Sequence, residues 1–390
     1  MQLADTFSLT ERYIIPTYTR FPVSFVKGEN AILYDENGRS YIDFSSGIAV
    51  TNLGHCNRRL VEALKNQAEK LWHVSNLYHI PNQAELARII VENSFEGKVF
   101  FCNSGAEANE GAIKFVRLWG KKFKDGAYKI ITATNSFHGR TIATISATGQ
   151  DKVKRGFEPL LEGFVHVPYN DIDSLMEAID SETVAVMLEP IQGEGGVSVP
   201  AETYMRKVRE ICDSYNILLI LDEVQTGIAR TGKLFAYMHF GIEPDIMTLA
   251  KGLGNGFPIG AIVANHKVLE AIEPSVHAST FGGNPLATAV ALEVMRIILE
   301  ENLWERAERL GNIVFERLSK ISHKIADLRG KGLLIGVELK DRSSRQITLE
   351  CLKRGLLVVP AGEKVVRLLP PITIEEDILM EGLSILESVL

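Results

Sequence analysis

Cysteine is scarce in this sequence. The four cysteines among 390 residues are Cys56, Cys102, Cys212 and Cys351, and no two of them form a C-x-x-C pair. Cysteines this far apart indicate neither a disulfide framework nor a zinc site of the common kinds. We therefore expect free thiols with mainly structural roles and no metal site.

The sequence also lacks long apolar runs, blocks of one charge and nucleotide-binding signatures. No apolar stretch reaches ~20 residues, and residues 1–6 lack the basic and apolar segments of a signal peptide, so we expect a cytoplasmic protein. The 42 basic and 49 acidic residues leave a formal charge of -7 without a basic stripe, which argues against nucleic acid and membranes as partners. Neither a Walker sequence nor G-x-G-x-x-G is present, which disfavours nucleotide binding.

What the sequence does contain is a repeated alternation of helix and strand patterns. Its 390 residues, 46% hydrophobic and 23% charged, suit a globular protein of two domains. Short apolar runs predict buried strands at 99–101, 129–131, 163–167, 184–188, 217–221 and 246–250. Because helical segments separate most of them, this alternation predicts an α/β fold with a mostly parallel sheet covered on both faces.

The two ends of the chain follow a different pattern. Residues 31–44 predict a hairpin with its turn at 34–39, and helical spacing follows at 60–71 and 83–93. The carboxyl third predicts a separate α/β lobe with helices at 285–302 and 305–321, a strand at 333–339, a helix after Ser344, and strands near 356–359 and 365–368. We expect the boundary of this lobe near residue 285.

Two of the predicted strands lead to a charged residue. The strand at 217–221 leads to Asp222, and the strand at 246–250 leads to Lys251, after which a glycine-rich turn begins. Because open α/β sheets bind ligands at the carboxyl ends of their strands, we expect this amine and this carboxylate to face a common crevice. The pair suits pyridoxal phosphate, which needs a lysine for its Schiff base and an acid beside its pyridine nitrogen.

A predicted helix start supplies a place for a phosphate. In the motif N-S-G-A-E-A-N-E at 103–110, Ser104 and Glu107 have the spacing of a capping box. The N–H groups of Gly105 and Ala106 would then be open to an anion. Most capping boxes have only a structural role, so the phosphate interpretation rests on the amine and carboxylate at the same edge of the sheet.

Three further segments carry chemically useful groups. In F-H-G-R-T, Phe137 offers a ring that can stack on a pyridine, and Arg140 offers a guanidinium that can hold a carboxylate. The loop E-P-I-Q-G-E-G-G places Glu194 after another apolar strand, and its first residue, Glu189, is interpreted as part of a polar turn. Hydroxyls of H-A-S-T-F-G-G-N-P at 277–285 would cap the following helix or reach a phosphate.

Taken in order, these motifs carry a family resemblance. S-G-A-E-A-N-E, F-H-G-R-T, E-P-I-Q-G-E-G-G, D-E-V-Q-T-G, L-A-K-G, S-T-F-G-G-N-P and V-R-L-L-P-P resemble the motifs of class III, ornithine-type, pyridoxal phosphate aminotransferases. The resemblance extends from residue 21 to residue 371. Within that class, F-S-S-G-I-A-V at 44–50 and L-G-H at 53–55 are most similar to the acetylornithine aminotransferases.

The resemblance implies a fold, an assembly and a set of cofactor contacts. The fold is type I: a large domain with a mainly parallel seven-stranded sheet at 59–285, a small α/β domain from 1–58 and 286–390, and a homodimer with shared active sites. For the cofactor pyridoxal 5'-phosphate, it implies Lys251 as the Schiff-base lysine and proton shuttle and Asp222 as the partner of the pyridine nitrogen. The other implied contacts are phosphate binding by Gly105, Ala106 and Thr280 of the partner subunit, ring contacts by Phe137 and Val224, and a hydrogen bond from Gln225 to the phenolic oxygen.

The resemblance also implies how one site accepts two substrates. Arg140 would hold the α-carboxylate of the amine donor or the distal carboxylate of glutamate, and Arg367 would hold the α-carboxylate of glutamate. Glu194 would pair with Arg367 while the terminal-amine substrate is bound, and Ser279 belongs to the same substrate-binding set. The expected reaction converts N2-acetyl-L-ornithine and 2-oxoglutarate to N-acetyl-L-glutamate 5-semialdehyde and L-glutamate, a step of arginine biosynthesis.

Other interpretations stay open at this level. Relatives that act on ornithine, N-succinyl-diaminopimelate, 4-aminobutyrate or a lysine-pathway amine share nearly all of these motifs. Tyr18, Arg20 and Phe21 are candidates for recognising the N-acyl group, and an anchor on the partner subunit is an equally good interpretation of them. A non-catalytic binding protein of the same fold is a further alternative, which the intact Lys251 and Asp222 disfavour.

Overall fold

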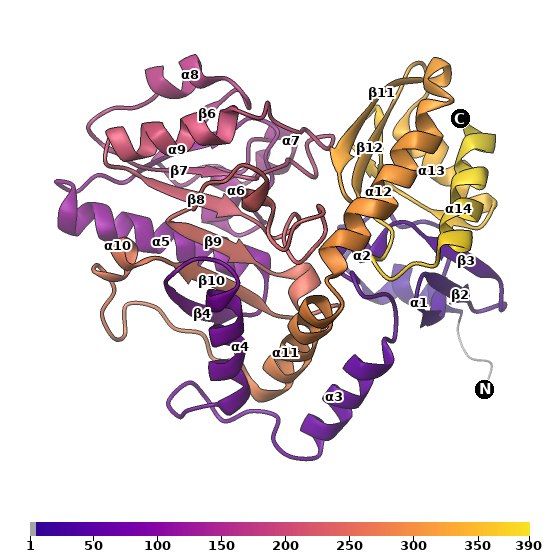
Figure 1. The fold of residues 1–390 in the computed structure, drawn as a ribbon, viewed down its shortest axis with the longest axis horizontal. Coiled ribbons are helices and arrows are strands. Elements are labelled where there is room, and N and C mark those ends of the chain that lie inside the picture. Colours follow the sequence, from indigo (N-terminus) through magenta and orange to yellow (C-terminus); the bar gives the residue numbers. More distant parts are fainter. Residues whose placement is uncertain (1–4) are drawn as a thin grey trace.

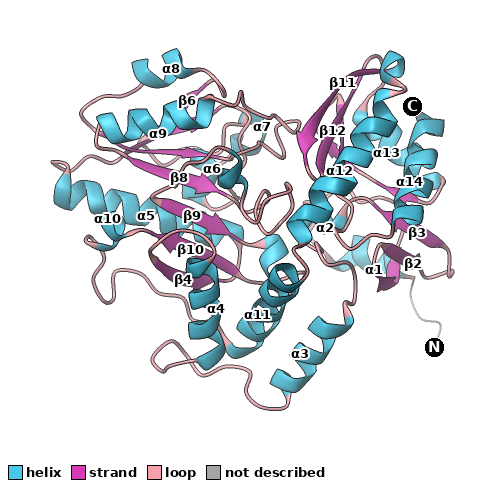
Figure 2. Ribbon diagram, viewed as in Figure 1, coloured by secondary structure: helices cyan, strands magenta, loops and turns pink. Residues whose placement is uncertain are grey.

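The computed structural model describes residues 5–390, so the first four residues of the amino-terminal segment lie outside the described part of the chain. Figure 1 shows a larger lobe around one seven-stranded sheet and a smaller lobe around two four-stranded sheets. Helices and strands are mixed in both lobes (Figure 2). None of the helices in residues 5–390 is long and apolar enough to cross a membrane.

The seven-stranded sheet organises the larger lobe, in the order β4-β10-β9-β8-β7-β5-β6. Its strands are β4 (Lys98–Cys102), β5 (Lys129–Ala133), β6 (Phe164–Val167), β7 (Thr183–Leu188), β8 (Leu218–Asp222), β9 (Ile246–Leu249) and β10 (Gly260–Ala264). The pairs from β9 to β6 are parallel, and β10 runs antiparallel to both of its neighbours. The sequence prediction of a mainly parallel α/β sheet is therefore confirmed.

Side chains of the central strands alternate between two hydrophobic cores, one on each face of this sheet. In β8, Leu219 and Leu221 belong to one core, Leu218 and Ile220 belong to the other, and all four are fully buried. A strand that is covered on both faces needs no polar side, which explains its continuous apolar run in the sequence.

Helices cover both faces and connect the strands. They are α4 (Pro81–Glu92), α5 (Gly105–Phe123), α6 (Ile142–Ala147), α7 (Asp151–Lys154), α8 (Ile172–Glu177), α9 (Tyr204–Ser214), α10 (His266–Leu269) and the 3-10 helices η1 (Ala236–His239) and η2 (Lys251–Leu253). The longest of these, α5, buries Ala108, Ala112 and Val116 at helical spacing in one of the two cores. Its first residue is thereby fixed beside the end of β4.

The smaller lobe is built from both ends of the chain. Its strands are β1 (Phe25–Glu29), β2 (Ile32–Asp35), β3 (Ser40–Asp43), β11 (Ile325–Lys331), β12 (Leu334–Leu339), β13 (Leu356–Leu357), β14 (Val359–Ala361) and β15 (Val365–Leu368). The predicted hairpin is confirmed by the antiparallel pair β2 and β3, and β13 joins β3 in parallel with Leu356 beside Ile42. The second sheet has the order β11-β12-β15-β14.

The remaining helices connect the two lobes or cover the smaller one. They are α1 (Thr6–Tyr13), α2 (Ser46–Ala49), α3 (Arg58–Ala68), α11 (Pro285–Glu300), α12 (Leu303–Ser319), α13 (Ser344–Lys353), α14 (Glu376–Val389) and the 3-10 helix η3 (Ser322–Lys324). The helices predicted at 60–71, 285–302, 305–321 and after Ser344 are confirmed as α3, α11, α12 and α13. No sequence pattern predicted α14, β10 or β11.

Candidate active site

A cavity of about 380 Å³ is lined by residues at or shortly after the carboxyl ends of β4, β5, β7, β8 and β9. The structure brings most of the predicted site residues together in its lining: Gly105, Ala106, Phe137, Arg140, Glu194, Asp222, Val224, Gln225 and Lys251. Arg367 contacts two of these residues from β15. The crevice expected at the carboxyl ends of the strands is therefore present.

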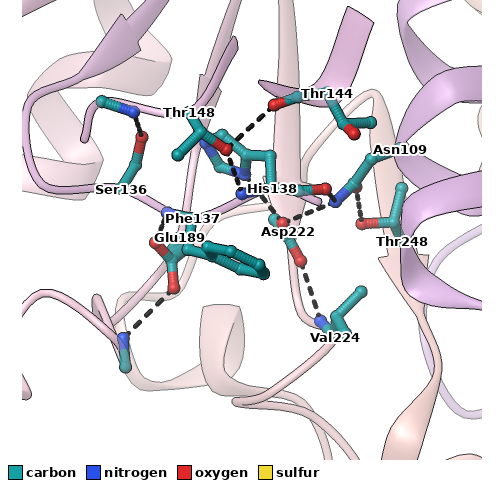
Figure 3. A network of polar contacts seen from close by, with 12 residues as sticks. Asn109, Ser136, Phe137, His138, Thr144, Thr148, Glu189, Asp222, Val224 and Thr248 are labelled. Carbon is teal, nitrogen blue, oxygen red and sulfur yellow. Dashed lines mark hydrogen bonds and ion pairs between the residues drawn. The ribbon is translucent and has the colours of Figure 1, made fainter. Parts of the chain in front are cut away.

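Asp222 is a buried carboxylate with one oxygen fully engaged and the other partly free. Its Oδ2 accepts hydrogen bonds from Asn109 Nδ2 at 2.7 Å and His138 Nδ1 at 2.8 Å, and its Oδ1 accepts one from the Val224 N–H at 3.1 Å (Figure 3). A carboxylate oxygen has two acceptor positions, so Oδ1 keeps one for a donor in the cavity.

Asn109 and His138 hold this carboxylate, and neither was predicted from the sequence as a site residue. The Asn109 amide also donates to the His138 carbonyl at 2.8 Å, and its oxygen accepts from Thr248 Oγ1 at 2.7 Å. The His138 N–H donates to Thr148 Oγ1 at 2.9 Å (Figure 3). Because a carboxylate only accepts, His138 Nδ1 carries a proton here. The sequence signal for these two residues was their position in the motifs N-S-G-A-E-A-N-E and F-H-G-R-T.

Lys251 is the first residue of η2, which follows β9 after Ala250, and it has an unusual backbone. Its φ of 44° lies in the left-handed region, which costs about 1–3 kcal/mol for a residue other than glycine and is often found at functional positions. Burial lowers the pKa of its amine, against the opposing charge of Glu194. The amine makes no hydrogen bond or ion pair with another side chain of residues 5–390. A buried amine without a partner and with a lowered pKa is a candidate nucleophile.

The predicted start of α5 is confirmed, but the predicted capping box is only half correct. Ser104 Oγ accepts from the Glu107 N–H at 3.2 Å, as expected. The Glu107 carboxylate accepts instead from Asn103, through its N–H at 2.5 Å and its side-chain amide at 2.9 Å. Asn103 offers two donors where the Ser104 backbone offers one, which explains the exchange of partner.

Gly105 explains why this helix begins with a small residue. A Cβ at this position would lie 2.7 Å from Val224 Cγ1, closer than van der Waals contact allows. Gly105 and Ala106 form the first turn of a 19-residue helix, and both residues line the cavity. Unpaired donors and the helix dipole make such a terminus favourable for an anion.

Glu189 is not the polar turn residue that the sequence suggested. It is buried, and it accepts hydrogen bonds from the Phe137 N–H at 2.9 Å and the Gly193 N–H at 3.1 Å (Figure 3). Burial raises its pKa to about 7. Glu189 therefore joins the loop that carries Phe137 to the loop that carries Glu194.

Arg367 is a buried guanidinium held between an amide and a carboxylate. Its Nη1 donates to Gln225 Oε1 at 2.7 Å, and its Nη2 donates to Glu194 Oε1 at 2.7 Å. Burial opposes ionisation of Glu194, but Arg367 and Lys251 together hold the pKa of Glu194 below its ordinary value. Arg140 is exposed in the same lining, 5.6 Å from the centre of the Phe137 ring.

Two predicted site residues lie outside the cavity of the single chain. Ser279 Oγ accepts from the Gly282 N–H at 2.9 Å, and Thr280 is exposed. Of the two alternatives for these hydroxyls, the cap of α11 is excluded, because Asn284 caps this helix by accepting from the Ala287 N–H at 2.9 Å. Asn284 directly precedes the helix, whereas both hydroxyls lie too far upstream to reach its first turn.

The three candidates for recognising an N-acyl group also lie away from the cavity lining. The Tyr18 side chain is 73% exposed, with the Arg20 guanidinium 5.4 Å from its ring centre. The Phe21 ring has the Arg345 guanidinium 6.0 Å from its centre. Within one chain, these residues have no contact with the cavity.

The lining of this cavity fits the pyridoxal phosphate that the sequence predicts. Asp222 Oδ1 offers a free acceptor for a pyridinium N–H, and the start of α5 offers N–H groups to a phosphate. Lys251 offers an amine without a partner in residues 5–390, and Gly105 leaves the space that a Cβ would fill. The described residues contain no group of histidine, cysteine and acidic side chains that could hold a metal ion.

Comparison with known proteins identifies one family. Residues 13–390 match the family model "Aminotransferase class-III". The chain is 52% identical over 384 residues to the acetylornithine aminotransferase of Caldanaerobacter subterraneus subsp. tengcongensis, covering 97% of this chain and 98% of that relative. It superposes with a TM-score of 0.88 and 37% identity on acetylornithine aminotransferase from Elizabethkingia anophelis, covering 98% of this chain and 97% of the other. With ornithine aminotransferase from Toxoplasma gondii ME49, the TM-score is 0.95 and the identity 36%, over 98% of this chain and 94% of the other.

Proposed function

This chain belongs to the class-III aminotransferase family, and we propose that it transfers the terminal amino group of N2-acetyl-L-ornithine to 2-oxoglutarate. The products are N-acetyl-L-glutamate 5-semialdehyde and L-glutamate, and the reaction is a step of arginine biosynthesis. The observation that carries the proposal is the closed ion pair between Glu194 and Arg367 beside Lys251. In this ion pair, Glu194 neutralises Arg367 while an amino donor that has no second carboxylate near Arg367 is bound. Relatives at 44–52% identity are named acetylornithine aminotransferase, which supports N2-acetyl-L-ornithine as the amino donor.

The enzyme depends on pyridoxal phosphate, which supplies an aldehyde that takes up the substrate amine and a ring that withdraws electrons from the neighbouring carbon. We assign Lys251 as the residue that binds the aldehyde and then moves the proton from the amine-bearing carbon of the substrate. Asp222 keeps the ring nitrogen protonated through its free oxygen position, while Asn109 and His138 fix its orientation. Gly105 and Ala106 bind the phosphate through their N–H groups.

The remaining side chains position the ring. Phe137 and Val224 line the cavity from different loops, and we assign them to the two faces of the ring. Gln225 Oε1 accepts a hydrogen bond from Arg367 Nη1, which leaves the amide N–H groups of Gln225 for the phenolic oxygen. Glu189 orients Phe137 through the backbone.

The two substrates use the two arginines differently. Arg140, which is exposed at the cavity, binds the α-carboxylate of N-acetylornithine or the distal carboxylate of glutamate. Arg367 is reserved for the α-carboxylate of glutamate and is neutralised by Glu194 at other times. Asn103 Nδ2, just before α5, donates to Ser279 Oγ at 3.3 Å. Ser279 therefore lies near the start of α5, and we include it in the substrate-binding set. A mobile carboxylate thus lets one cavity accept substrates with one or two acidic ends.

An isotope-transfer experiment tests the proposed reaction. We expect purified protein supplied with pyridoxal phosphate, 2-oxoglutarate and N-acetylornithine labelled with nitrogen-15 at the terminal amine to produce labelled glutamate, measured by mass spectrometry. Donor labelled only at the acetylated nitrogen is the control and transfers no label, because that nitrogen is an amide. The proposal would be wrong if no labelled glutamate formed from N-acetylornithine labelled at the terminal amine.

We also propose that the chain works as a homodimer whose interface includes an apolar patch beside Thr280. The patch consists of Leu71, Trp72, Leu77, Tyr78 and Phe281, whose side chains are between 45% and 86% exposed. Asn76 Nδ2 donates to the Ser279 and Gly282 carbonyls at 3.1 and 2.9 Å, so both segments form one surface. Large apolar side chains gathered in this way usually mark a contact with another protein. Thr280 of the partner subunit then completes the phosphate contacts.

The combined change Trp72→Asp and Leu77→Asp is expected to convert a dimer to a monomer in sedimentation analysis. Activity should fall roughly tenfold or more, because a charge-assisted phosphate contact is lost. Phe157→Asp, which alters another exposed aromatic side chain (56%), is the matched control and should leave a dimer. A wild-type monomer with full activity would refute the proposed assembly.

Two further expectations accompany this function. We propose that the enzyme resides in the cytoplasm. We propose that residues 59–285 act as the cofactor-binding domain and that 1–58 and 286–390 act together as the small domain, with Arg367 carried by the latter.

A further inference from the structure

A second cavity lies on the other side of Glu194. Its volume is about 750 Å³, and it is lined by the loop and helix at 149–154 and by residues of β11, β12 and the 361–365 segment. Figure 1 shows α7 on the side of the larger lobe that faces β11 and β12. Glu194 lines both this second cavity and the active-site cavity, so its carboxylate can be reached from either side.

Most of the cations in the second cavity are already engaged. Lys154 Nζ lies 3.2 Å from His166 Nε2, and Lys364 Nζ donates to the Lys340 carbonyl at 3.3 Å. Arg329 donates to the Gly196 carbonyl at 3.0 Å and pairs with the carboxylates of Asp327 at 2.7 Å and Glu338 at 2.5 Å.

Lys152 is the exception. It is exposed, and it forms no hydrogen bond or ion pair with another side chain of residues 5–390. Its charge already acts on Glu194: although burial opposes ionisation, Arg367, Lys251 and Lys152 each help to lower the pKa of Glu194. Of the other acids of this cavity, Glu338 pairs with Arg329, and Asp151 and Glu363 are exposed.

The Glu194 carboxylate needs a new partner when it separates from Arg367. A carboxylate released inside a protein without a new partner loses several kcal/mol of favourable interaction, so an unpaired position would make dicarboxylate binding costly. Gly193, Gly195 and Gly196 flank it, and Gly196 has a φ of 87° that favours glycine. The Glu194 side chain is 31% exposed, whereas that of Arg367 is fully buried, so Glu194 is the residue of the pair that can move.

We propose that Lys152 receives the Glu194 carboxylate in the second cavity when glutamate or 2-oxoglutarate takes its place on Arg367. Lys152 is then a positioning residue of the dicarboxylate half-reaction that does not itself touch substrate. The inference rests on the proposed function, because it assigns Arg367 to a substrate carboxylate. It explains how one ion pair opens without leaving a buried charge uncompensated.

The test measures each half-reaction separately on the holoenzyme, by stopped-flow absorbance of the cofactor. Lys152→Ala is expected to lower the second-order rate constant with glutamate about fivefold, the effect of a partly exposed ion pair, while the constant with N-acetylornithine changes much less. Lys152→Arg should restore the glutamate value. Lys364→Ala removes the same charge from the same cavity and should change neither constant.

A double-mutant cycle with Glu194→Gln separates this role from simple attraction of anions. If Lys152 acts through Glu194, Lys152→Ala has no further effect once Glu194 is neutral. An equal loss in both backgrounds, or an equal loss in both half-reactions, would overturn the proposal. Aminotransferases that use other amino donors also react with glutamate, so the glutamate rate constants test the role of Lys152 even if N-acetylornithine does not react. Reaction with N-acetylornithine tests the proposed function separately.

Discussion

Replacing Lys251 by alanine is expected to lower kcat about 10⁴-fold in both half-reactions, the upper end of the range for loss of a general acid–base group. The amine is buried, its pKa is lowered, and no other lysine lines the cavity among the described residues. The variant therefore has no side chain to take its place in moving the substrate proton. Single-turnover absorbance measurements give both rate constants directly.

Three comparisons show whether this loss comes from proton transfer. Lys251→Arg keeps a positive charge but cannot deprotonate, so we expect a similar loss. A small primary amine such as methylamine should restore part of the activity of the alanine variant, because it can enter the vacated space. Lys233→Ala, an exposed lysine outside the cavity, is the control for general effects. A Lys251→Ala enzyme with more than about a tenth of the normal rate would contradict the assignment.

Replacing Asp222 by asparagine is expected to lower kcat about 10³-fold, the size found when one preorganised electrostatic contact is removed from an active site. Asparagine has nearly the same shape and can still accept the hydrogen bonds from Asn109 and His138 on one side. It carries no negative charge, so it cannot keep the ring nitrogen protonated. The rates are measured with excess cofactor, which separates catalysis from cofactor affinity.

Phe137→Leu is the matched comparison for Asp222→Asn. It removes aromatic stacking, worth about 0.5–1.5 kcal/mol, and should therefore reduce the rate only up to about tenfold. Asp222→Glu keeps the charge and should retain more activity than Asp222→Asn if charge matters more than shape. If Asp222→Asn costs no more than Phe137→Leu, the carboxylate lacks the role we assign to it.

The sequence predicted the cavity because the relevant residues follow strands. A buried parallel strand has a continuous apolar run, and the first charged or small residue after it marks the carboxyl end of the sheet. This is why Asp222, Lys251 and the start of α5 were predicted to face one crevice and are found in one lining. The pairing of Arg367 with Glu194 was expected from family resemblance alone, since 173 residues separate them.

Other parts could not be predicted because their signals depend on tertiary contacts. Glu189 resembled a turn residue, and its buried contact with Phe137 exists only after two segments far apart in the sequence have come together. His138 and Asn109 were hidden in the same way, since each reaches Asp222 from a different element. β11 has mostly exposed or partly buried residues and lacks the apolar run that identified the other strands.

The most direct measurement is a single half-turnover followed by cofactor absorbance, with N-acetylornithine, ornithine and 4-aminobutyrate added separately to the purified holoenzyme. The proposed function predicts that N-acetylornithine reacts fastest by roughly tenfold or more, about 1.4 kcal/mol of transition-state preference. Faster reaction with ornithine or 4-aminobutyrate would contradict the assigned donor, although membership of the aminotransferase family would stand.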